Sequence, residues 1–401
     1  MPLDVIETLC ELVRRPSVNP MGRAVAGDEF YEHRVTDYLQ DLFQQLGWRW
    51  QRQAVAPGRD NILARIDGDP SPEDGGSLLL FEAHQDTVPV DGMTIPPWTA
   101  QVRDGRVYGR GACDVKGALA CILAALSRLA EEPPAGRPTV VVACTINEEY
   151  GGTGALAVPQ LWQADGGLLP RPPDAVIVSE PTALDVVVAH KGLVRWRCST
   201  RGRAAHSSQP QHGDNAIYLM ALVVTALERY AREVIPQLAQ HRLLSPPTLS
   251  VGLISGGISV NTIPDSCTIE IDRRLLPQEP PQAAVDHARA HLAAELGDAA
   301  AAVEHEPPYG VYWGLSDERN AALATALSRT AQEAGGSGGL IGVAYGTDAP
   351  AFSRLGIPTV VLGTGAIDQA NTADEWVAVD QLHAATGILY RFASRFRAHA
   401  G

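Results

Sequence analysis

The stretch Ser77-Leu78-Leu79-Leu80-Phe81-Glu82-Ala83-His84-Gln85-Asp86 decides the fold class, because a short apolar run ends there in polar residues that can bind a ligand. Residues 77–82 are too few for a typical helix and predict a buried strand. Strands are also predicted at 139–145, 174–179 and 359–362, and a buried helix at 117–126. Alternating strands and helices predict an α/β domain with a mostly parallel sheet flanked by helices.

A second pattern begins near residue 189. Residues 190–198 and 266–272 alternate between apolar and polar side chains, as half-exposed strands do, and 215–232 predicts one long helix. We therefore expect a smaller α+β domain at 189–304, inserted into a larger α/β domain made of residues 1–188 and 305–401. Two domains are also the usual organisation for a chain of 401 residues.

Composition excludes several classes of function. The formal net charge of -14 repels phosphate backbones and anionic lipids, so we expect no nucleic-acid partner. The chain contains no apolar run long enough to span a membrane and no export signal at its start, so we expect no membrane association. The six scattered cysteines are typical of core residues in a cytoplasmic protein.

Acids and histidines collect directly after the predicted strands. His84 and Asp86 follow the first strand, Glu148 and Glu149 follow the second, and Glu180 follows the third. Ligands bind at the carboxyl ends of strands in open α/β sheets, so these side chains should converge in one crevice. One imidazole with several carboxylates suits a divalent metal ion, and zinc is the natural candidate.

Each feature also has a simpler interpretation. Asp86 could orient the ring of His84 from two residues away, or it could be a solvated turn residue. Asp114, which precedes the apolar helix, could bridge metal ions or cap the helix. Glu148 and Glu149 could divide metal binding and proton transfer between them, or they could be an exposed pair in a loop.

Four motifs occur in order along nearly the whole chain: His84-Gln85-Asp86-Thr87-Val88-Pro89, Gly109-Arg110-Gly111 with Asp114-Val115-Lys116-Gly117, Glu148-Glu149, and Ser179-Glu180-Pro181. Together they resemble the metallopeptidase and deacylase family that includes acetylornithine deacetylase, succinyl-diaminopimelate desuccinylase, aminoacylase and glutamate carboxypeptidase. The resemblance implies a catalytic domain formed by 1–188 and 305–401, and a lid or dimerisation domain at 189–304.

The resemblance also implies a set of metal ligands. His84 and Glu180 would hold one ion, Glu149 would belong to the second ion, and Asp114 would bridge both. The peptide bond between Asp114 and Val115 would be cis. The expected cofactor is Zn²⁺, as one or two ions, with Co²⁺ or Mn²⁺ as alternatives. Glutamate at position 180 is similar to the deacylase and carboxypeptidase branches of the family.

Five further roles follow from the same resemblance. Asp86 would orient His84's ring, and Glu148 would be the general base that activates water and then protonates the leaving nitrogen. His206, in the lid, would reach the partner subunit's active site and stabilise the oxyanion. Asn261 and Arg274 would bind the substrate carboxylate, for which a guanidinium offers two parallel donors. The simpler interpretations are a turn histidine for His206 and an exposed strand residue for Arg274.

One position departs from the family pattern. The family ends in a metal-binding histidine within Ala-His-x-x-Asp-Glu, whereas this chain has Ala370-Asn371-Thr372-Ala373-Asp374-Glu375. An amide oxygen is a poor zinc ligand, so the second metal should be weakly held, replaced by a harder ion, or absent. His190 or His212 could take the place of the missing ligand.

Three hypotheses about function follow. The first is a metal-dependent hydrolase that cleaves the amide bond of an N-acyl amino acid or small peptide-like substrate, similar to acetylornithine deacetylase and homodimeric through the lid. The second is an altered family member that binds an amino-acid-like ligand or uses the pocket for another reaction, because Asn371 replaces the histidine. The third is a regulatory or scaffold subunit that pairs with an active relative.

Overall fold

The computed structural model describes residues 1–163 and 167–398, which form two compact units. The first unit comprises Met1–Val188, Asp317–Ile341 and Thr347–Gly401, and the second comprises Ala189–Ser316 and Gly342–Gly346. The second unit thus extends beyond the predicted end at residue 304. The reason is strand pairing, because β12 (Val303–His305) and β13 (Gly310–Tyr312) both pair with β9 (Gly192–Arg201).

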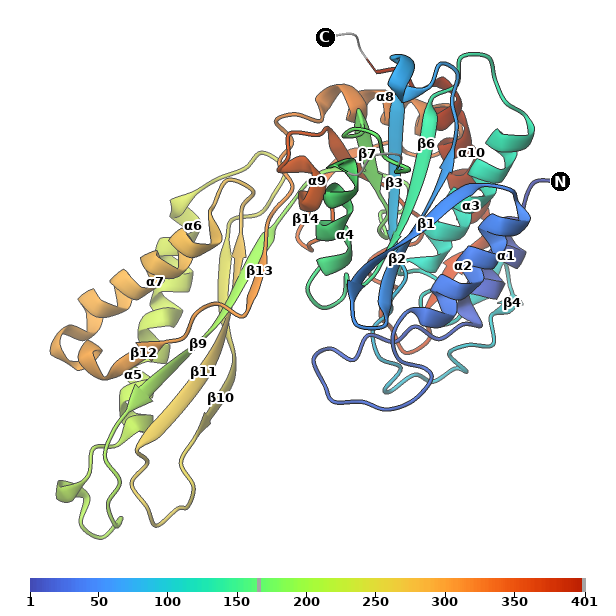
Figure 1. The fold of residues 1–401 in the computed structure, drawn as a ribbon. Helices are drawn as coiled ribbons and strands as arrows, with labels where there is room; N and C mark the ends of the chain where they lie inside the picture. Colours follow the sequence, from blue (N-terminus) through green and yellow to red (C-terminus); the bar gives the residue numbers. More distant parts are fainter. Residues whose placement is uncertain (164–166, 399–401) are drawn as a thin grey trace. The chain divides into compact units, whose positions relative to one another are not determined.

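An eight-stranded sheet forms the centre of the first unit (Figure 1). In spatial order its strands are β1 (Arg49–Ala56), β2 (Arg59–Ile66), β6 (Thr139–Thr145), β3 (Leu78–His84), β7 (Ala175–Val178), β15 (Thr359–Val361), β8 (Val186–His190) and β14 (Leu340–Val343). The four central strands, β6 to β15, are parallel to one another, whereas β1, β2 and β8 pair antiparallel with their neighbours. The predicted α/β class and parallel core are confirmed, and the antiparallel outer strands were not predicted.

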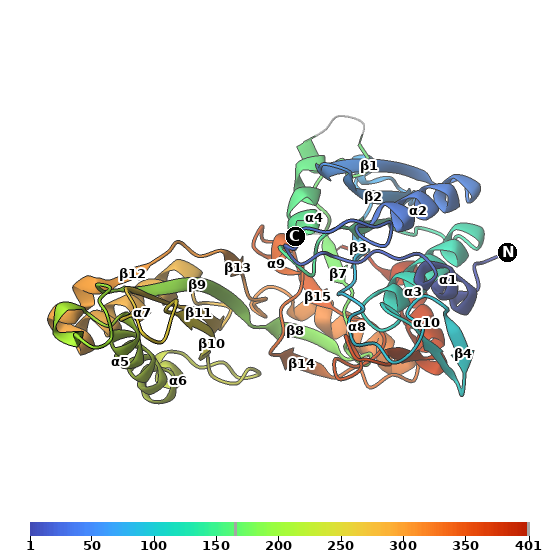
Figure 2. The same ribbon diagram turned by 90° about the horizontal axis from the view of Figure 1, so that it is seen from below.

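Helices cover this sheet, so its central strands need apolar residues on both faces. Every residue of β3, β6 and β7 is buried. Helices α1, α3 and α10 pack side by side (Figures 1 and 2). The helices of this unit are α1 (Val5–Val13), α2 (His33–Gln45), α3 (Lys116–Glu131), α4 (Thr153–Ala157), α8 (Ala321–Glu333), α9 (Pro350–Ser353) and α10 (Val379–Arg395).

A small antiparallel sheet accompanies the large one in the first unit. It consists of β4 (Gln101–Arg103), β5 (Arg106–Tyr108) and β16 (Trp376–Ala378), with β5 in the middle. The pairing of β16 with β5 brings the segment around Asn371 and Glu375 close to the glycine-bounded turn at 109–117. Short 3-10 helices occur at Pro72–Asp74 and Val158–Gln163.

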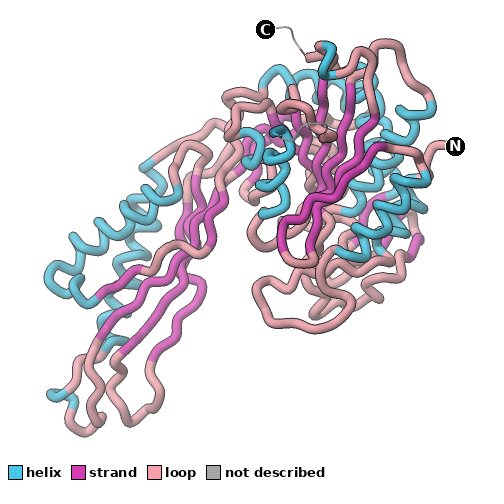
Figure 3. Tube along the Cα trace, in the orientation of Figure 1, coloured by secondary structure: helices cyan, strands magenta, loops and turns pink. Residues whose placement is uncertain are grey.

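The second unit is an antiparallel sheet with helices on one face, as predicted (Figure 3). Its strands lie in the order β10 (Thr248–Gly256), β11 (Ser266–Leu275), β9 and β12, with β13 also paired to β9. Helices α5 (Ala216–Arg229) and α7 (Pro281–Leu296) contact β9 and β11. The fully buried Trp196 lies in the core between the sheet and these helices.

The predicted helix at 215–232 is not uniform. The side chain of Asn215 caps α5 by accepting the main-chain N–H groups of Ile217 and Tyr218. The chain then continues as a π-helical turn at Tyr230–Val234 and as α6 (Ile235–Leu238), whose second residue is proline. Further 3-10 turns occupy Pro210–His212 and Gly297–Ala302. Among the residues that the structure describes, no helix is long and apolar enough to cross a membrane.

Candidate metal centre and its surroundings

The candidate metal centre lies at the carboxyl edge of the parallel strands. His84 is the last residue of β3, Glu148 and Glu149 follow β6, and Glu180 follows β7. These three strands are parallel neighbours, with β3 paired to both β6 and β7. Their polar ends therefore lie along one edge, as the sequence predicts.

The ring of His84 is oriented by a hydrogen bond to a main-chain carbonyl group. Its Nδ1 atom is 2.9 Å from the carbonyl oxygen of Asp86, which can only accept, so Nδ1 carries the hydrogen. Its Nε2 atom faces Asp114 Oδ1 at 3.2 Å and Glu180 Oε1 at 3.8 Å. In the neutral ring this nitrogen presents a lone pair to two carboxylates. A proton or a cation between them is needed to relieve the repulsion.

His84, Asp114 and Glu180 can together hold a metal ion. One donor atom from each lies within 4.8 Å of the others, and all three side chains are buried. Asp114 is not the cap of α3, because Val115 holds that position and no side chain caps the helix. The peptide bond between Asp114 and Val115 is cis, which confirms that expectation.

The Asp86 carboxylate holds the loop of Glu148 and Glu149 through hydrogen bonds. Its Oδ1 atom accepts the main-chain N–H of Glu148 at 3.1 Å, and Oδ2 accepts that of Glu149 at 3.2 Å. The Asn19 amide donates to the same Oδ2 at 2.8 Å. The shortest distance from this carboxylate to His84 Nδ1 is 3.7 Å. Asp86 therefore contacts the ring through its main chain, and it contacts the loop of Glu148 and Glu149 through its side chain.

The electrostatics of the cluster favour a bound cation. Burial, together with the charge of Asp114, raises the pKa of both Glu149 and Glu180 well above the ordinary value. Burial is also the main cause of the raised pKa of Glu148. Within the described residues, Oε1 of Glu149 is buried without a hydrogen-bond partner. One imidazole, several carboxylates and an unpaired buried oxygen fit a divalent ion such as zinc.

Asn371 contacts the candidate metal centre where the family pattern has histidine. Its Nδ2 atom is 3.4 Å from Asp114 Oδ2. Its backbone φ of 62° lies in the left-handed region, which asparagine tolerates better than most residues. The side chain thus presents an amide donor to the carboxylate expected to bridge two metals.

The sequence analysis missed the role of Glu375. This fully buried carboxylate accepts the main-chain N–H groups of Gly111, Cys113 and Asp114 at 3.1, 2.8 and 3.0 Å. Arg110 Nη1 also donates to it at 2.6 Å. Glu375 therefore holds the turn that presents Asp114. The sequence did offer a sign of this role, because Asp374-Glu375 ends the C-terminal motif that resembles the family pattern.

Asp348 is a second residue that the sequence analysis missed. It is 6% exposed, and burial followed by the charge of Glu82 raises its pKa well above the ordinary value. A Cβ atom on Gly152 would lie 3.0 Å from Asp348 Oδ1, so Asp348 packs against the loop that follows Glu149. It escaped notice because residues 340–343, which precede it as β14, were not predicted as a strand.

Comparison with known proteins identifies the family. The family described as Peptidase family M20/M25/M40 matches residues 80–395. The chain belongs to this family. Members of the M20 family hydrolyse amide bonds with the help of metal ions, and this chain is a metal-dependent amide hydrolase.

Relatives within the M20 family match most of the chain. It is 30% identical to an acetylornithine deacetylase from Myxococcus xanthus over 90% of this chain and 92% of the relative. A tripeptidase from Staphylococcus aureus shares the fold with a TM-score of 0.77, at 21% identity and 98% coverage of both chains. A dinuclear metal-binding M20 peptidase from Bacillus subtilis has a TM-score of 0.69, at 17% identity, covering 97% of this chain and 96% of that one.

His206 and Asn261 lie close together within the second unit of this M20 protein. The main-chain N–H of Ser207 donates to the carbonyl oxygen of Asn261 at 3.0 Å. The N–H of Ser208 points at His206 Nδ1 at 3.2 Å, and this nitrogen must therefore accept. In the neutral ring the hydrogen is then on Nε2. The exposed imidazole presents a donor to its surroundings.

Arg274 lies at the other end of the same sheet. Asn261 precedes β11, and Arg274 is the ninth residue of that strand. At about 3.3 Å per residue, the part of β11 from Ser266 to Arg274 alone spans roughly 26 Å, and Asn261 lies before its start. The Arg274 side chain is half-buried and donates from Nε to Asp272 Oδ1 at 2.8 Å. One chain therefore does not bring Asn261 and Arg274 to a single small ligand.

His190 and His212, the alternative ligands considered for the second metal, also belong to the second unit. His190 is fully buried, and its Nδ1 atom is 2.9 Å from the carbonyl oxygen of Lys191. Burial lowers its pKa to about 4. His212 is exposed and ends a short 3-10 turn.

Proposed function

We propose that this protein hydrolyses the amide bond of an N-acyl amino acid, in the manner of an acetylornithine deacetylase. The observation that carries the proposal is the buried cluster of His84, Asp114 and Glu180, with Glu148 and Glu149 held beside it by Asp86. Relatives about 30% identical that bear the name acetylornithine deacetylase support this substrate class.

The proposed metal ligands follow from the donor set. His84 and Glu180 would hold one ion, Asp114 would be shared, and Glu149 would belong to a second ion beside Asn371. Zinc suits a mixture of imidazole and carboxylate, and cobalt or manganese are alternatives. Zinc, when bound, polarises a carbonyl group and acidifies water.

Glu148 is the proposed proton carrier. Its carboxylate would accept a proton from the attacking water and deliver it to the leaving nitrogen, so that the C–N bond breaks and an amine and a carboxylate form. Its raised pKa suits a group that must both accept and donate a proton. Asp86 would position Glu148 by holding the main-chain N–H groups of the loop.

Replacement of Glu148 tests this assignment. Glu148→Gln should lower kcat for Nα-acetyl-L-ornithine by about 10² to 10⁴ with little change in metal content. Glu132→Gln, an exposed glutamate just after α3, is the matched control and should retain full activity. Unchanged hydrolysis by Glu148→Gln would show that another group transfers the proton.

Substrate binding is proposed to need two copies of the chain. His206 would donate from Nε2 to the oxyanion, and Asn261 and Arg274 would bind the substrate carboxylate. The roughly 26 Å of β11 that lies between Asn261 and Arg274 supports contributions from different subunits. We therefore propose a homodimer formed through the second unit.

The exposed edge of the second unit supports such a dimer. β10 is the first strand in the sheet order, and on it Leu253 and Ile254 are 64% and 62% exposed. Tyr218 and Leu222 on α5 are also exposed. An unpaired edge with apolar side chains is a suitable surface for pairing with a second copy.

Lysine substitutions on β10 test whether this edge forms the dimer interface. Leu253→Lys combined with Ile254→Lys should convert the dimer to monomer in sedimentation analysis and should remove activity. Leu355→Lys, at an exposed apolar residue of the first unit, is the control and should change neither property. A wild-type monomer with full activity would contradict the proposed sharing of active-site residues.

Asn371 favours a second candidate function. An amide donor facing Asp114 weakens the second metal position, so the pocket could bind an amino-acid-like ligand without hydrolysing it. Metal analysis of the chain, purified without chelator and titrated with zinc, separates the two candidates. Hydrolysis with one or two bound ions supports the first, and ligand binding without turnover supports the second.

A cytoplasmic location is also proposed, because all six cysteines are buried free thiols.

A further inference from the structure

The loop that carries Glu148 and Glu149 is fixed at the residue directly before it. Asn147 has a backbone φ of 62°, which lies in the left-handed region. Its main-chain N–H donates to Glu32 Oε1 at 3.2 Å, and its carbonyl oxygen accepts the N–H of Gly152 at 2.8 Å. Both main-chain polar groups of Asn147 are therefore held where the chain enters the two glutamates.

The side chain of Asn147 is held as well. Its Oδ1 atom accepts hydrogen bonds from Arg59 Nη1 and from Asn19 Nδ2, both at 2.9 Å. Its Nδ2 atom donates to Thr153 Oγ1 at 3.0 Å. A guanidinium can only donate, so Arg59 fixes which way the amide of Asn147 faces. The Asn19 amide also donates to Asp86 Oδ2 at 2.8 Å, and the network thus reaches the carboxylate that holds the loop.

A buried ion pair lies at the start of this network. Arg59, the first residue of β2, donates from Nε to Glu32 Oε2 at 2.9 Å and from Nη2 to Glu32 Oε1. The Glu32 side chain is fully buried and that of Arg59 is 12% exposed. Apolar side chains of similar volume are often as stabilising as a buried ion pair, so stability gives little reason for this one. Unlike apolar groups, the pair supplies a directed donor and a directed acceptor to Asn147.

We propose that Arg59 and Glu32 are positioning residues for Glu148, and that they act through Asn147. The guanidinium fixes the Asn147 side chain and the Glu32 carboxylate fixes its N–H, so the chain enters Glu148 in one conformation. The inference rests on the proposed function, in which Glu148 carries the proton. Misplacement of such a group by about 1 Å is enough to lower a rate about 100-fold.

A double variant tests the proposal in the zinc-loaded, full-length protein. Arg59→Met alone would leave the Glu32 carboxylate buried without its partner, so Arg59→Met is combined with Glu32→Gln. Because both charges are removed together, the urea midpoint should stay close to that of the wild type. The kcat for Nα-acetyl-L-ornithine should fall about 10- to 100-fold, whereas KM should change less than about threefold and zinc content should not change. A folded double variant with the kcat of the wild type would overturn the proposal.

A second variant does not disturb the ion pair. Asn147→Gly retains the left-handed backbone conformation, which glycine adopts readily, but it removes the amide that Arg59 holds. Its kcat should fall in the same way as that of the double variant. Arg52→Met is the matched control, because Arg52 lies on the neighbouring strand β1 and forms a comparable ion pair with Asp37 at 2.6 Å. Its kcat should remain that of the wild type.

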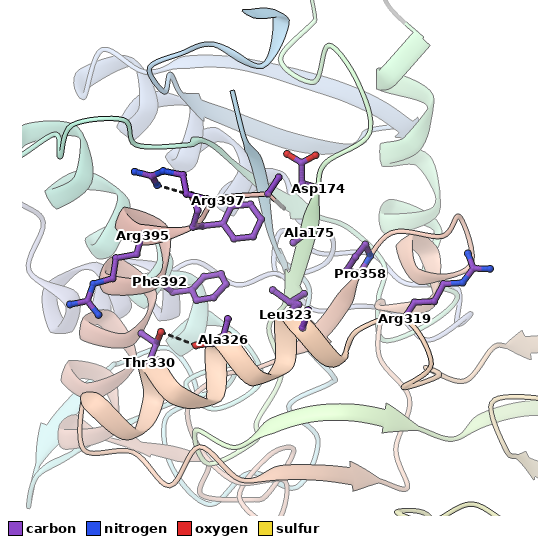
Figure 4. A pocket seen from close by; sticks show the side chains of 13 residues that line it. Asp174, Ala175, Arg319, Leu323, Ala326, Thr330, Pro358, Phe392, Arg395 and Arg397 are labelled. Carbon is purple, nitrogen blue, oxygen red and sulfur yellow. Dashed lines mark hydrogen bonds between the residues drawn. The ribbon is translucent and has the colours of Figure 1, made fainter. Parts of the chain in front are cut away.

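A stability control separates positioning from general destabilisation. Leu323 lines a cavity of about 500 Å³ that borders Ala175 at the start of β7, whereas Glu180 follows the other end of this strand (Figure 4). Leu323→Ala removes a buried apolar side chain, so it should lower the urea midpoint without lowering kcat. A loss of kcat in Leu323→Ala equal to that of the double variant would overturn the proposal.

Hydrogen exchange followed by mass spectrometry measures the loop without reference to activity. The N–H groups of Glu148 and Glu149 both donate to Asp86, so they should be protected in the wild type. In the double variant the peptide 146–152 should exchange about tenfold faster, whereas the peptide 139–145, which is β6, should be unchanged.

The exchange measurement also separates this inference from the proposed function. Unchanged exchange of the peptide 146–152 in the folded double variant would overturn the positioning of the loop, whatever the activity. If exchange rises in the variant but the wild type hydrolyses no N-acyl amino acid, the proposed function fails and the positioning of the loop stands.

Discussion

Glu375→Gln should have a large effect on stability, although Glu375 is not one of the proposed metal ligands. Glu375 is fully buried and accepts hydrogen bonds from Arg110 and from the main-chain N–H groups of Gly111, Cys113 and Asp114. Glutamine has nearly the same shape, but it replaces one acceptor oxygen with a donor. That donor would face other donors, and Arg110 would lose its counter-charge.

The size of the effect follows from these contacts. Removing one partner of a buried ion pair costs about 3 to 5 kcal/mol, because it leaves the other charge buried and uncompensated. A buried N–H left without an acceptor costs about 1 to 3 kcal/mol on its own, and the two costs overlap. We therefore expect Glu375→Gln to lower the free energy of unfolding of the first unit by about 3 to 5 kcal/mol.

Urea unfolding at pH 8 measures this loss, and the alkaline pH is chosen because burial raises the pKa of Glu375. Zinc affinity should fall in parallel, because the turn that presents Asp114 loses its support. Asp374→Asn, the exposed neighbour, is the matched control and should change the free energy by about 0.5 kcal/mol or less. A loss below about 1 kcal/mol for Glu375→Gln would refute the claim that this carboxylate holds the turn.

Three further predictions concern metal content and pH. Asn371→His should raise the affinity for a second zinc ion, measured by calorimetry, and an unchanged stoichiometry and affinity would show that position 371 is not part of the site. Removal of metal with EDTA should lower Tm more at pH 8 than at pH 6. In the metal-free fold the pKa values of Glu149 and Glu180 are raised above those of the unfolded chain, so stability is lost as pH rises through the folded-state values. An equal decrease in Tm at both pH values would contradict this prediction. His190 binds a proton near pH 6.5 in the unfolded chain and only near pH 4 in the folded chain, so acid favours unfolding. The free energy of unfolding should fall by about 3 kcal/mol as pH falls through this window. His190→Gln should show a flatter dependence of this free energy on pH.

Local features of the sequence were sufficient to predict the centre of the fold. The run that ends in His84 and the run at 139–145 are apolar, short and bounded by turn residues, and the structure has them as the paired strands β3 and β6. Parallel central strands need apolar residues on both faces, which makes them visible without knowledge of their neighbours. The positions of Glu148, Glu149 and Glu180 at one edge follow from the same order of strands.

Other features depend on residues far apart in the chain and became visible only in the tertiary structure. Glu375 meets Asp114 across 261 positions, and no local periodicity reports such a contact. The end of the second unit at Ser316 depends on β12 and β13 pairing with β9, which residues 303–312 do not show by themselves. The separation of Asn261 from Arg274 depends on the length of one unbroken strand. The sequence by itself determined which residues are candidates for the chemistry, because residue type and spacing are local. The tertiary structure decided which of them meet and support one another, because hydrogen bonds and packing join distant segments.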